Sequence, residues 1–468
     1  MLSWAVVLGL LARQILAIPT ISAKGSKLFT SDGAQFYIKG LAYQPTPNDP
    51  LANTNQCQLD VALMQTLGTN AIRVYHVDAS LDHDGCMSAF ANAGIYVWLD
   101  LDTFSTYILQ NTSPTPQWTK SMFQAYADVM DTFQKYDNVA GFFVGNEMLT
   151  TGASSIAAPY VKAAAADMKA YRDKQGYRDI PIGYSAADIP ALRPNLQNYL
   201  ACGSDAADAV DFYSLNAYEW CGDSSYDESG YDILEKNASN YNIPIFFSET
   251  GCIVPEPRLF ADQAAILGPE MDHTWSGAII YEWVETTNNY GLISYGPPSG
   301  AEPTVSVQPE IGGYSVGGAP TPLNPGFTNL KNQWATLSPT GVSENAYTPS
   351  NTPPACPSYT SGYWEVSGNV ALPTIGAAAV TGPTGSAGSG SGSSGTGSGY
   401  GSASQSSGSG SAKSTASHNG AARPTHAIMH SAGMAAVEGW FGRTENSNPA
   451  LFWFVGIACA ILGPAIAL

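Results

Sequence analysis

Eight short apolar segments, separated by stretches of helical periodicity such as 121–135 and 159–174, constrain the fold of this 468-residue chain most. Segments this short, several bounded by Gly or Pro, are typical of strands buried on both faces. Strands that alternate with helices predict a parallel sheet. Eight units predict an α/β fold of the (β/α)8 TIM-barrel type, with a doubly wound open sheet as the alternative. The segments are 36–43, 71–75, 96–101, 139–146, 180–184, 210–215, 245–248 and 278–283.

Several classes of function are disfavoured by what the sequence lacks. No GxGxxG follows the first segment and no GxxxxGK[ST] occurs, which argues against a nucleotide site. The formal net charge of −19 argues against binding of nucleic acid. No CxxC pair is present, which argues against a zinc cluster. We expect a protein that needs neither a metal nor another cofactor.

Two of the apolar segments end on a glutamate. Residues 141–147 (GFFVGNE) end at Asn146 and Glu147, and residues 243–249 (IPIFFSE) end at Glu249. The carboxyl ends of barrel strands share one face, so we expect the two glutamates to converge there. Carboxyl groups about 5 to 5.5 Å apart are the apparatus of retaining glycosidic cleavage. A single glutamate would more often cap a helix or pair with an arginine, but two of them, one beside an asparagine, favour catalysis.

The finer pattern resembles glycoside hydrolase family 72, the fungal β-1,3-glucanosyltransferases anchored by GPI. The matching stretches span nearly the whole expected folded region: 38–44 (IKGLAYQ), 71–75 (AIRVY), 96–101 (YVWLDL), 145–147 (GNE), 214–221 (SLNAYEWC), 247–252 (FSETGC) and 281–283 (YEW). The resemblance implies that Glu147 is the general acid/base and Glu249 the nucleophile. It also implies substrate-binding roles for Gln44, Tyr75, Asp100, Asn146, Tyr218 and Tyr281. Without the resemblance, packing alone would explain the tyrosines and the aspartate.

The activity that this resemblance implies is a retaining transfer reaction. The enzyme would cleave a β-1,3-glucan donor and pass the new reducing end to an acceptor glucan chain, elongating the cell-wall polymer as a monomer. A secreted retaining endo-β-glycosidase on the same fold is one alternative. A glucan-binding wall protein without catalysis is another, which the retention of both glutamates disfavours.

The two ends of the chain resemble processing signals. We expect a signal peptide at 1–17, a catalytic domain at 18–366, a disordered Ser/Gly-rich stalk at 367–430 and a GPI-attachment signal at 431–468, with Ser431 as the attachment residue. The processed protein would be anchored in the outer leaflet of the plasma membrane and located in the cell wall. A tail-anchored transmembrane helix is the alternative for the apolar residues 451–468. No cysteine-rich module fits before the stalk, as in short forms of the family.

The cysteines predict a disulfide framework. The chain has seven, of which Cys459 falls in the apolar tail, and six cysteines in a secreted protein allow fifteen connectivities. Loops that follow neighbouring barrel strands suggest the hypothesis Cys57–Cys86 and Cys221–Cys252, and Cys202 and Cys356 remain as the third pair. Two sequons predict N-glycans at Asn111 and Asn237.

Overall fold

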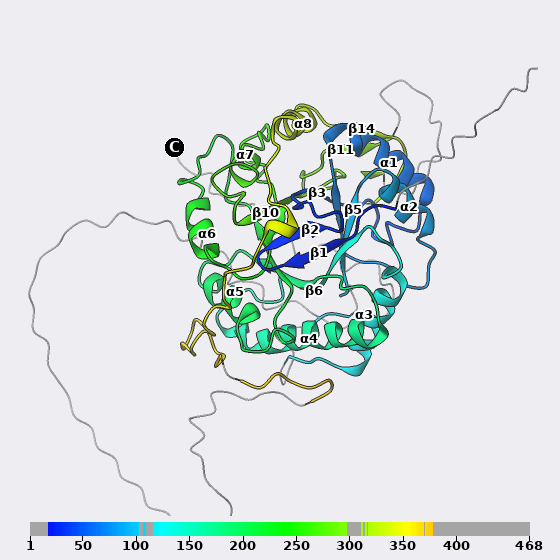
Figure 1. Ribbon diagram of the computed structural model, residues 1–468. Coiled ribbons are helices and arrows are strands. Elements are labelled where there is room, and N and C mark those ends of the chain that lie inside the picture. The colour runs from blue at the N-terminus through cyan, green and yellow to red at the C-terminus, as the bar shows by residue number, and fades with distance from the viewer. Residues whose placement is uncertain are drawn as a thin grey trace, which may run out of the picture. The chain divides into compact units, whose positions relative to one another are not determined.

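Eight parallel strands close into a barrel in the computed structural model (Figure 1), which describes residues 17–102, 106–108, 116–296, 310–311, 314–315, 317–368 and 370–377. The strand order is β10-β3-β4-β5-β6-β7-β8-β9, and each neighbouring pair is parallel. The predicted TIM barrel is therefore confirmed, and an open sheet is excluded. The barrel strands are β3 (Ile38–Ala42), β4 (Ala71–Val74), β5 (Tyr96–Asp100), β6 (Val139–Asn146), β7 (Ile182–Ala187), β8 (Phe212–Ala217), β9 (Ile245–Thr250) and β10 (Trp275–Ile280).

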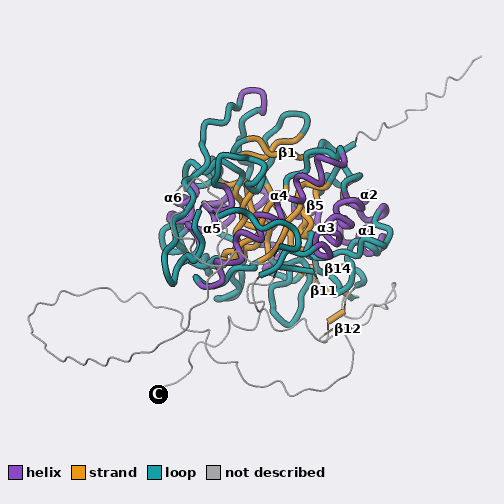
Figure 2. The backbone as a smooth tube through the Cα atoms, turned by 90° about the horizontal axis from the view of Figure 1, so that it is seen from below, coloured by secondary structure: helices purple, strands orange, loops and turns teal. Residues whose placement is uncertain are grey.

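Helices cover the outside of this barrel (Figures 1 and 2). Asn53 caps the first one by accepting a hydrogen bond from the backbone of Gln56, and Gly68 ends it in the left-handed conformation with φ 82°. They are α1 (Thr54–Leu67), α2 (Asp84–Asn92), α3 (Lys120–Phe133), α4 (Ala158–Gln175), α5 (Arg193–Ala201), α6 (Tyr231–Ala238), α7 (Asp262–Ile266) and α8 (Gly326–Thr336), with 3-10 turns η1 (Ala153–Ala157) and η2 (Glu344–Ala346).

The eighth strand shows the largest difference from the prediction. It was expected at 278–283, but β10 begins at Trp275 and ends at Ile280. Residues 275–284 are almost continuously apolar or aromatic, so the sequence carries no boundary signal there. The consequence is that Tyr281 and Glu282 lie beyond the strand, at the carboxyl end of the barrel.

Aromatic side chains fill the amino-terminal half of the barrel interior. The ring of Trp98 packs against Phe212 and Phe246, with centroids 5.1 and 4.8 Å away. Gly141 permits this packing, because a Cβ there would lie 2.5 Å from the Trp98 ring. The polar site is thereby confined to the opposite end of the barrel.

A hairpin that the sequence analysis did not predict closes the amino end (Figure 1). It pairs β1 (Ile21–Lys24) with β2 (Lys27–Thr30) in antiparallel register, and buried Ile21 and Leu28 join the interior cluster.

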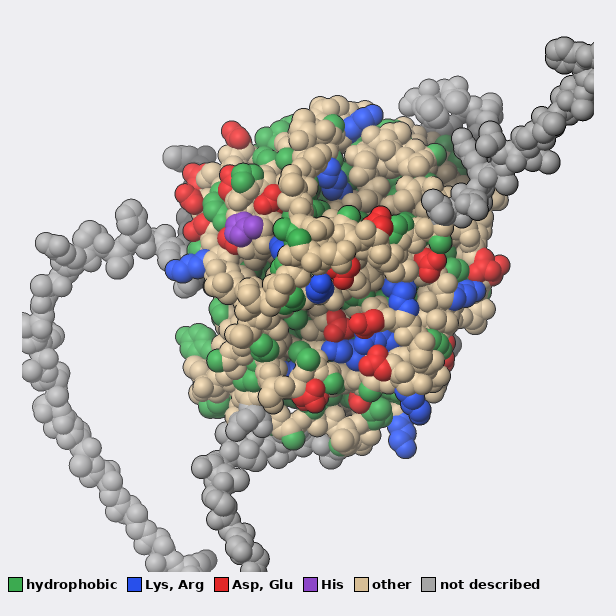
Figure 3. Space-filling model, viewed as in Figure 1, with side chains coloured by type: hydrophobic (Ala, Val, Ile, Leu, Met, Phe, Trp, Pro, Cys, Tyr) green, Lys and Arg blue, Asp and Glu red, His purple; other side chains and the backbone are tan. Residues whose placement is uncertain are grey.

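Acidic and basic side chains are intermingled on the face seen in Figure 3. Outside the barrel, β11 (Ile293–Tyr295) pairs with β14 (Pro320–Pro322), and β12 (Glu310–Ile311) with β13 (Tyr314–Ser315).

The segment after α8 runs along the barrel and stays packed against it. Trp364 is fully buried beside Tyr199, and the backbone N–H of Gly376 donates to the carbonyl of Trp118 at 2.7 Å. Disulfides join the three expected pairs, Cys57–Cys86, Cys202–Cys356 and Cys221–Cys252.

Several sequence predictions fall outside the described residues. These are the signal peptide up to residue 16, the sequon at Asn111, the stalk beyond residue 377, Ser431 and the apolar tail. Asn237, the other sequon, is partly exposed near the end of α6. No helix in the described part of the chain has the length and hydropathy of a membrane span.

Candidate active site

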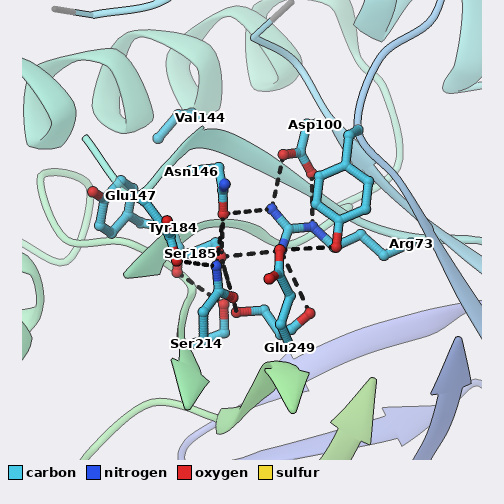
Figure 4. Close-up of polar contacts among 12 residues, drawn as sticks. Arg73, Asp100, Val144, Asn146, Glu147, Tyr184, Ser185, Ser214 and Glu249 are labelled. Atoms are coloured by element: carbon cyan, nitrogen blue, oxygen red, sulfur yellow. Dashed lines mark hydrogen bonds and ion pairs between the residues drawn. The ribbon is translucent and has the colours of Figure 1, made fainter. Parts of the chain in front are cut away.

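Glu147 and Glu249 stand at the same end of the barrel, after its fourth strand and near the end of its seventh (Figure 4). Asn216, from β8, links their surroundings. Its side-chain N–H donates to Oε1 of Glu147 at 2.9 Å. In the parallel pairing of β8 with β9, Asn216 lies directly beside Glu249. The two carboxyl groups thus face one polar cluster, as the sequence predicted.

A buried arginine, Arg73 of β4, lies at the centre of this cluster. Its side chain is 0% exposed, and it donates to both oxygens of Asp100, at 3.0 and 2.8 Å. It also donates to Oδ1 of Asn146 at 3.0 Å and to Oε1 of Glu249 at 3.4 Å. Figure 4 shows the guanidinium between these three side chains. The cation compensates two buried carboxyl groups that would otherwise be costly.

Glu249 is almost completely enclosed, with 7% of the residue exposed. Burial is the largest influence and raises its pKa to about 7, the positive charge of Arg73 opposes this, and the negative charge of Glu147 raises it further. Two phenols favour the ionised form, since Tyr75 donates to Oε1 at 2.9 Å and Tyr218 to Oε2 at 2.6 Å. Glu249 is therefore an oriented carboxylate that takes up a proton on mild acidification.

Glu147 differs from Glu249 in being exposed to solvent. Its backbone has φ 52°, in the left-handed region that non-glycine residues seldom adopt and that is often found at functional sites. The preceding residue, Asn146, ends β6 and is held by Arg73 and by the hydroxyl of Ser185 at 2.8 Å. An exposed carboxyl beside a buried one can exchange protons with groups arriving from solvent.

The remaining predicted residues also gather here. Tyr75, Asp100 and Tyr218 contact Arg73 or Glu249 directly. Tyr281 follows β10, and its ring packs against Tyr218 with centroids 6.3 Å apart. Gln44 lies after β3, with its side-chain nitrogen 3.5 Å from the Tyr281 hydroxyl. Asp100 is bound to Arg73 on both oxygens, so its observed contacts are structural ones.

Sequence reasoning missed the residues that support these side chains. Arg73, Ser185, Asn216 and Ser248 form the cluster beneath the glutamates, and each lies on a barrel strand. One signal was available, because an arginine in a strand buried on both faces requires an anionic partner. Tyr290 was also missed, although its ring packs 5.7 Å from that of Tyr218.

No group of three or more His, Cys, Asp or Glu residues able to hold a metal ion occurs among the residues that the structure describes. The arrangement is instead two carboxyl groups, one exposed and one buried, at the carboxyl end of a parallel barrel. This combination defines the class: a barrel protein equipped for chemistry at a glycosidic bond.

Comparison with known proteins narrows the class to a family. The model of the family described as "Glucanosyltransferase" (Glyco_hydro_72) matches residues 11–302, so the chain belongs to glycoside hydrolase family 72. The chain is 41% identical to 1,3-beta-glucanosyltransferase gas2 of Schizosaccharomyces pombe, over 75% of this chain and 74% of that protein. It is 39% identical to 1,3-beta-glucanosyltransferase GAS5 of Saccharomyces cerevisiae, over 79% and 73%.

Other relatives extend well beyond the matched region. Protein EPD1 of Candida maltosa is 39% identical, and the match covers 75% of this chain but only 61% of that protein. Among solved structures, a mutant of Saccharomyces cerevisiae Gas2p in complex with laminaritetraose and laminaripentaose is similar, with a TM-score of 0.66 and 35% identity over 76% of this chain and 74% of that one.

Proposed function

We propose that this chain is a retaining β-1,3-glucanosyltransferase that cleaves a β-1,3-glucan and transfers the new reducing end to another glucan chain. The observation that carries the proposal is the pair Glu147 and Glu249 on the fourth and seventh strands around one polar cluster. Membership of the family and the glucanosyltransferase names of its relatives support the activity. The laminari-oligosaccharides bound by the Gas2p mutant support β-1,3-glucans as donor and acceptor.

In this proposal the two glutamates have different roles. Glu249 attacks the anomeric carbon as an ionised nucleophile, which Arg73, Tyr75 and Tyr218 favour by donating hydrogen bonds to it. Exposed Glu147 protonates the departing sugar and then, as a base, activates the incoming hydroxyl. Because Glu249 must be ionised, kcat/KM should fall as the pH falls through its pKa.

The surrounding residues would position the sugar. Gln44, Tyr75, Asn146, Tyr218 and Tyr281 place polar groups or rings around the carboxyl pair. Positioned hydrogen bonds that strengthen in the transition state raise kcat. Transfer rather than hydrolysis then requires that an acceptor hydroxyl be oriented better than water.

The remaining predictions are retained as parts of the proposal. They are a secreted monomer with N-glycans at Asn111 and Asn237, domain boundaries at 17, 366 and 430, and a GPI anchor at Ser431 that holds the enzyme outside the plasma membrane and in the cell wall. The boundary expected at 366 moves toward the C-terminus, because residues 370–377 still pack against the barrel. The 1,3-beta-glucanosyltransferase names of the relatives support a location outside the cell, where a secreted enzyme would meet glucan chains.

Incubation with a reduced laminari-oligosaccharide acceptor and an unreduced donor tests the activity. Mass analysis should detect products longer than either starting chain. Products no longer than the donor would instead indicate an endo-β-glycosidase, and binding without any product would indicate a non-catalytic wall protein. Glu147→Gln and Glu249→Gln serve as matched inactive controls, since each keeps the side-chain shape.

A further inference from the structure

Glu282 is a third glutamate at the site, and double displacement requires only two. It lies two residues after β10 and is 2% exposed. Among the described residues, no Lys or Arg forms a salt bridge with it. An unpaired acid is expensive to bury, so its contacts should reveal what it does.

The two oxygens of Glu282 hold side chains from different segments. Oε1 accepts a hydrogen bond from the amide of Asn288 at 2.6 Å. Oε2 lies 3.5 Å from the side-chain nitrogen of Gln44, which is also 3.5 Å from the hydroxyl of Tyr281. One carboxyl group therefore joins the ends of β3 and β10 to the loop that follows β10.

That loop carries a tyrosine toward the nucleophile. The side-chain oxygen of Asn288 accepts from the backbone N–H of Tyr290 at 3.1 Å, so its nitrogen is left to face Glu282. The Tyr290 ring packs against Tyr281 and Tyr218, with centroids 5.4 and 5.7 Å away. Tyr218 in turn donates to Glu249. Glu282 thus supports the tyrosines beside the nucleophile without bonding to it.

The position of Glu282 in the barrel indicates which half of the substrate it affects. β3 and β10 are neighbours, and β6 lies on the opposite side of the eight-stranded ring. Glu147 follows β6 and, as acid/base, faces the leaving group and the acceptor. Gln44 and Glu282 lie across the barrel from it, on the side left for the donor sugar.

We propose that Glu282 is a positioning residue for the donor sugar, acting through the amide of Gln44 and the Tyr281–Tyr290 ring pair. This proposal rests on the proposed glycosyl transfer. Burial raises the pKa of Glu282 to about 8, the hydrogen bond from Asn288 opposes this, and the charge of Glu249 raises it further. Near pH 7 the group is therefore largely neutral while much of Glu249 is still ionised, so Glu282 adds little negative charge beside the nucleophile.

Glu282→Gln tests the proposal without changing the charge at such a pH. The new amide keeps an oxygen toward Asn288 but presents its NH2 to the NH2 of Gln44, which loses one of its two acceptors and keeps only the hydroxyl of Tyr281. We expect kcat/KM for laminari-oligosaccharides to fall by about 5- to 100-fold, the usual range for one lost buried hydrogen bond. Tm should fall by a few degrees at most, and the ratio of transfer to hydrolysis should stay unchanged. Glu256→Gln, on the exposed loop after β9, is the matched control and should behave as wild type.

A double-mutant cycle with Gln44→Ala separates positioning from general support of the fold. If Glu282 acts through Gln44, its substitution should have little further effect in the Gln44→Ala background. Asn288→Ala reaches the same network and replaces Glu282→Gln if that variant fails to fold. Wild-type kcat/KM in the single variant, additive effects in the cycle, or an altered product ratio would overturn the proposal. A wild-type enzyme that elongates no oligosaccharide would refute the proposed function instead.

Discussion

Replacement of Arg73 by Met should lower both the stability and the activity at acidic pH. The arginine is the positive charge bound to Asp100 and Glu249, which are only 2% and 7% exposed. Removing one partner of a buried ion pair typically costs about 3 to 5 kcal/mol. We expect a loss of this size in the free energy of unfolding, measured by urea denaturation, and a decrease of roughly 10 °C in Tm.

The activity of Arg73→Met should change in a specific way with pH. Arg73 opposes the rise in the pKa of Glu249, which is about 7 in its presence. Without the guanidinium this pKa rises further, so the acid limb of the kcat/KM profile moves to higher pH. At any pH on that limb, moving the midpoint up by about one pH unit lowers the ionised fraction of Glu249 about tenfold. Initial rates on laminari-oligosaccharides between about pH 4 and 8 would measure the displacement of the limb.

Arg178→Met is the matched control for this experiment. Arg178 is also largely buried, but it donates to the backbone carbonyls of Ile21, Tyr136 and Val139 at the amino end of the barrel. Its loss should lower Tm and leave the acid limb in place. An acid limb that stays unchanged in Arg73→Met, or that moves equally in both variants, would refute the electrostatic role assigned to Arg73.

Three further predictions address other parts of the molecule. Glu147→Gln and Glu249→Gln should each lower kcat by at least about a thousandfold, and wild-type turnover in either variant would end the catalytic assignment. Tm should change little for exposed Glu147 and should fall for Glu249, which pairs with buried Arg73. Mild reductant should open the Cys221–Cys252 disulfide first, because Cys221 is exposed, and should slow turnover. Thiol labelling and initial rates measure both effects, and earlier labelling of the fully buried pair Cys57–Cys86 would contradict the prediction. Burial raises the pKa of Asp60 to about 6 in the folded protein, so the contribution of Asp60 to stability grows as the pH falls from 6 toward 4. The free energy of unfolding of Asp60→Asn, relative to that of the wild type, should therefore rise between about pH 4 and 7. A difference in urea midpoints that does not change with pH would contradict this.

The barrel and the glutamate pair were predictable because both depend on local patterns. Short apolar runs mark the strands, and a charge that ends such a run marks the face where chemistry occurs. The cluster under the glutamates was not predictable in the same way. Arg73 finds its partners on β5, β6 and β9, and such contacts arise only when the barrel closes. The β1–β2 hairpin was missed although Gly25 and Ser26 form a two-residue turn, a recognised hairpin signal.

The hydrogen-bond inventory of that cluster determines how Asn146 is oriented. Its side-chain oxygen accepts from Arg73, from Ser185 at 2.8 Å and from Asn216 at 3.0 Å. Ser185 has one hydroxyl proton, and Ser248 already donates to the oxygen of Asn216 at 2.8 Å, so the proton of Ser185 is available for Asn146.

With its oxygen occupied by three donors, Asn146 has only its NH2 group to offer a ligand. Figure 4 shows this nitrogen turned away from the guanidinium of Arg73. A group that can only donate suits a sugar hydroxyl that accepts a hydrogen bond beside the scissile linkage. The buried cluster thus fixes two properties at once, the charge state of Glu249 and the donor character of Asn146. Substitutions within it should therefore alter rate and substrate binding together, in a non-additive way.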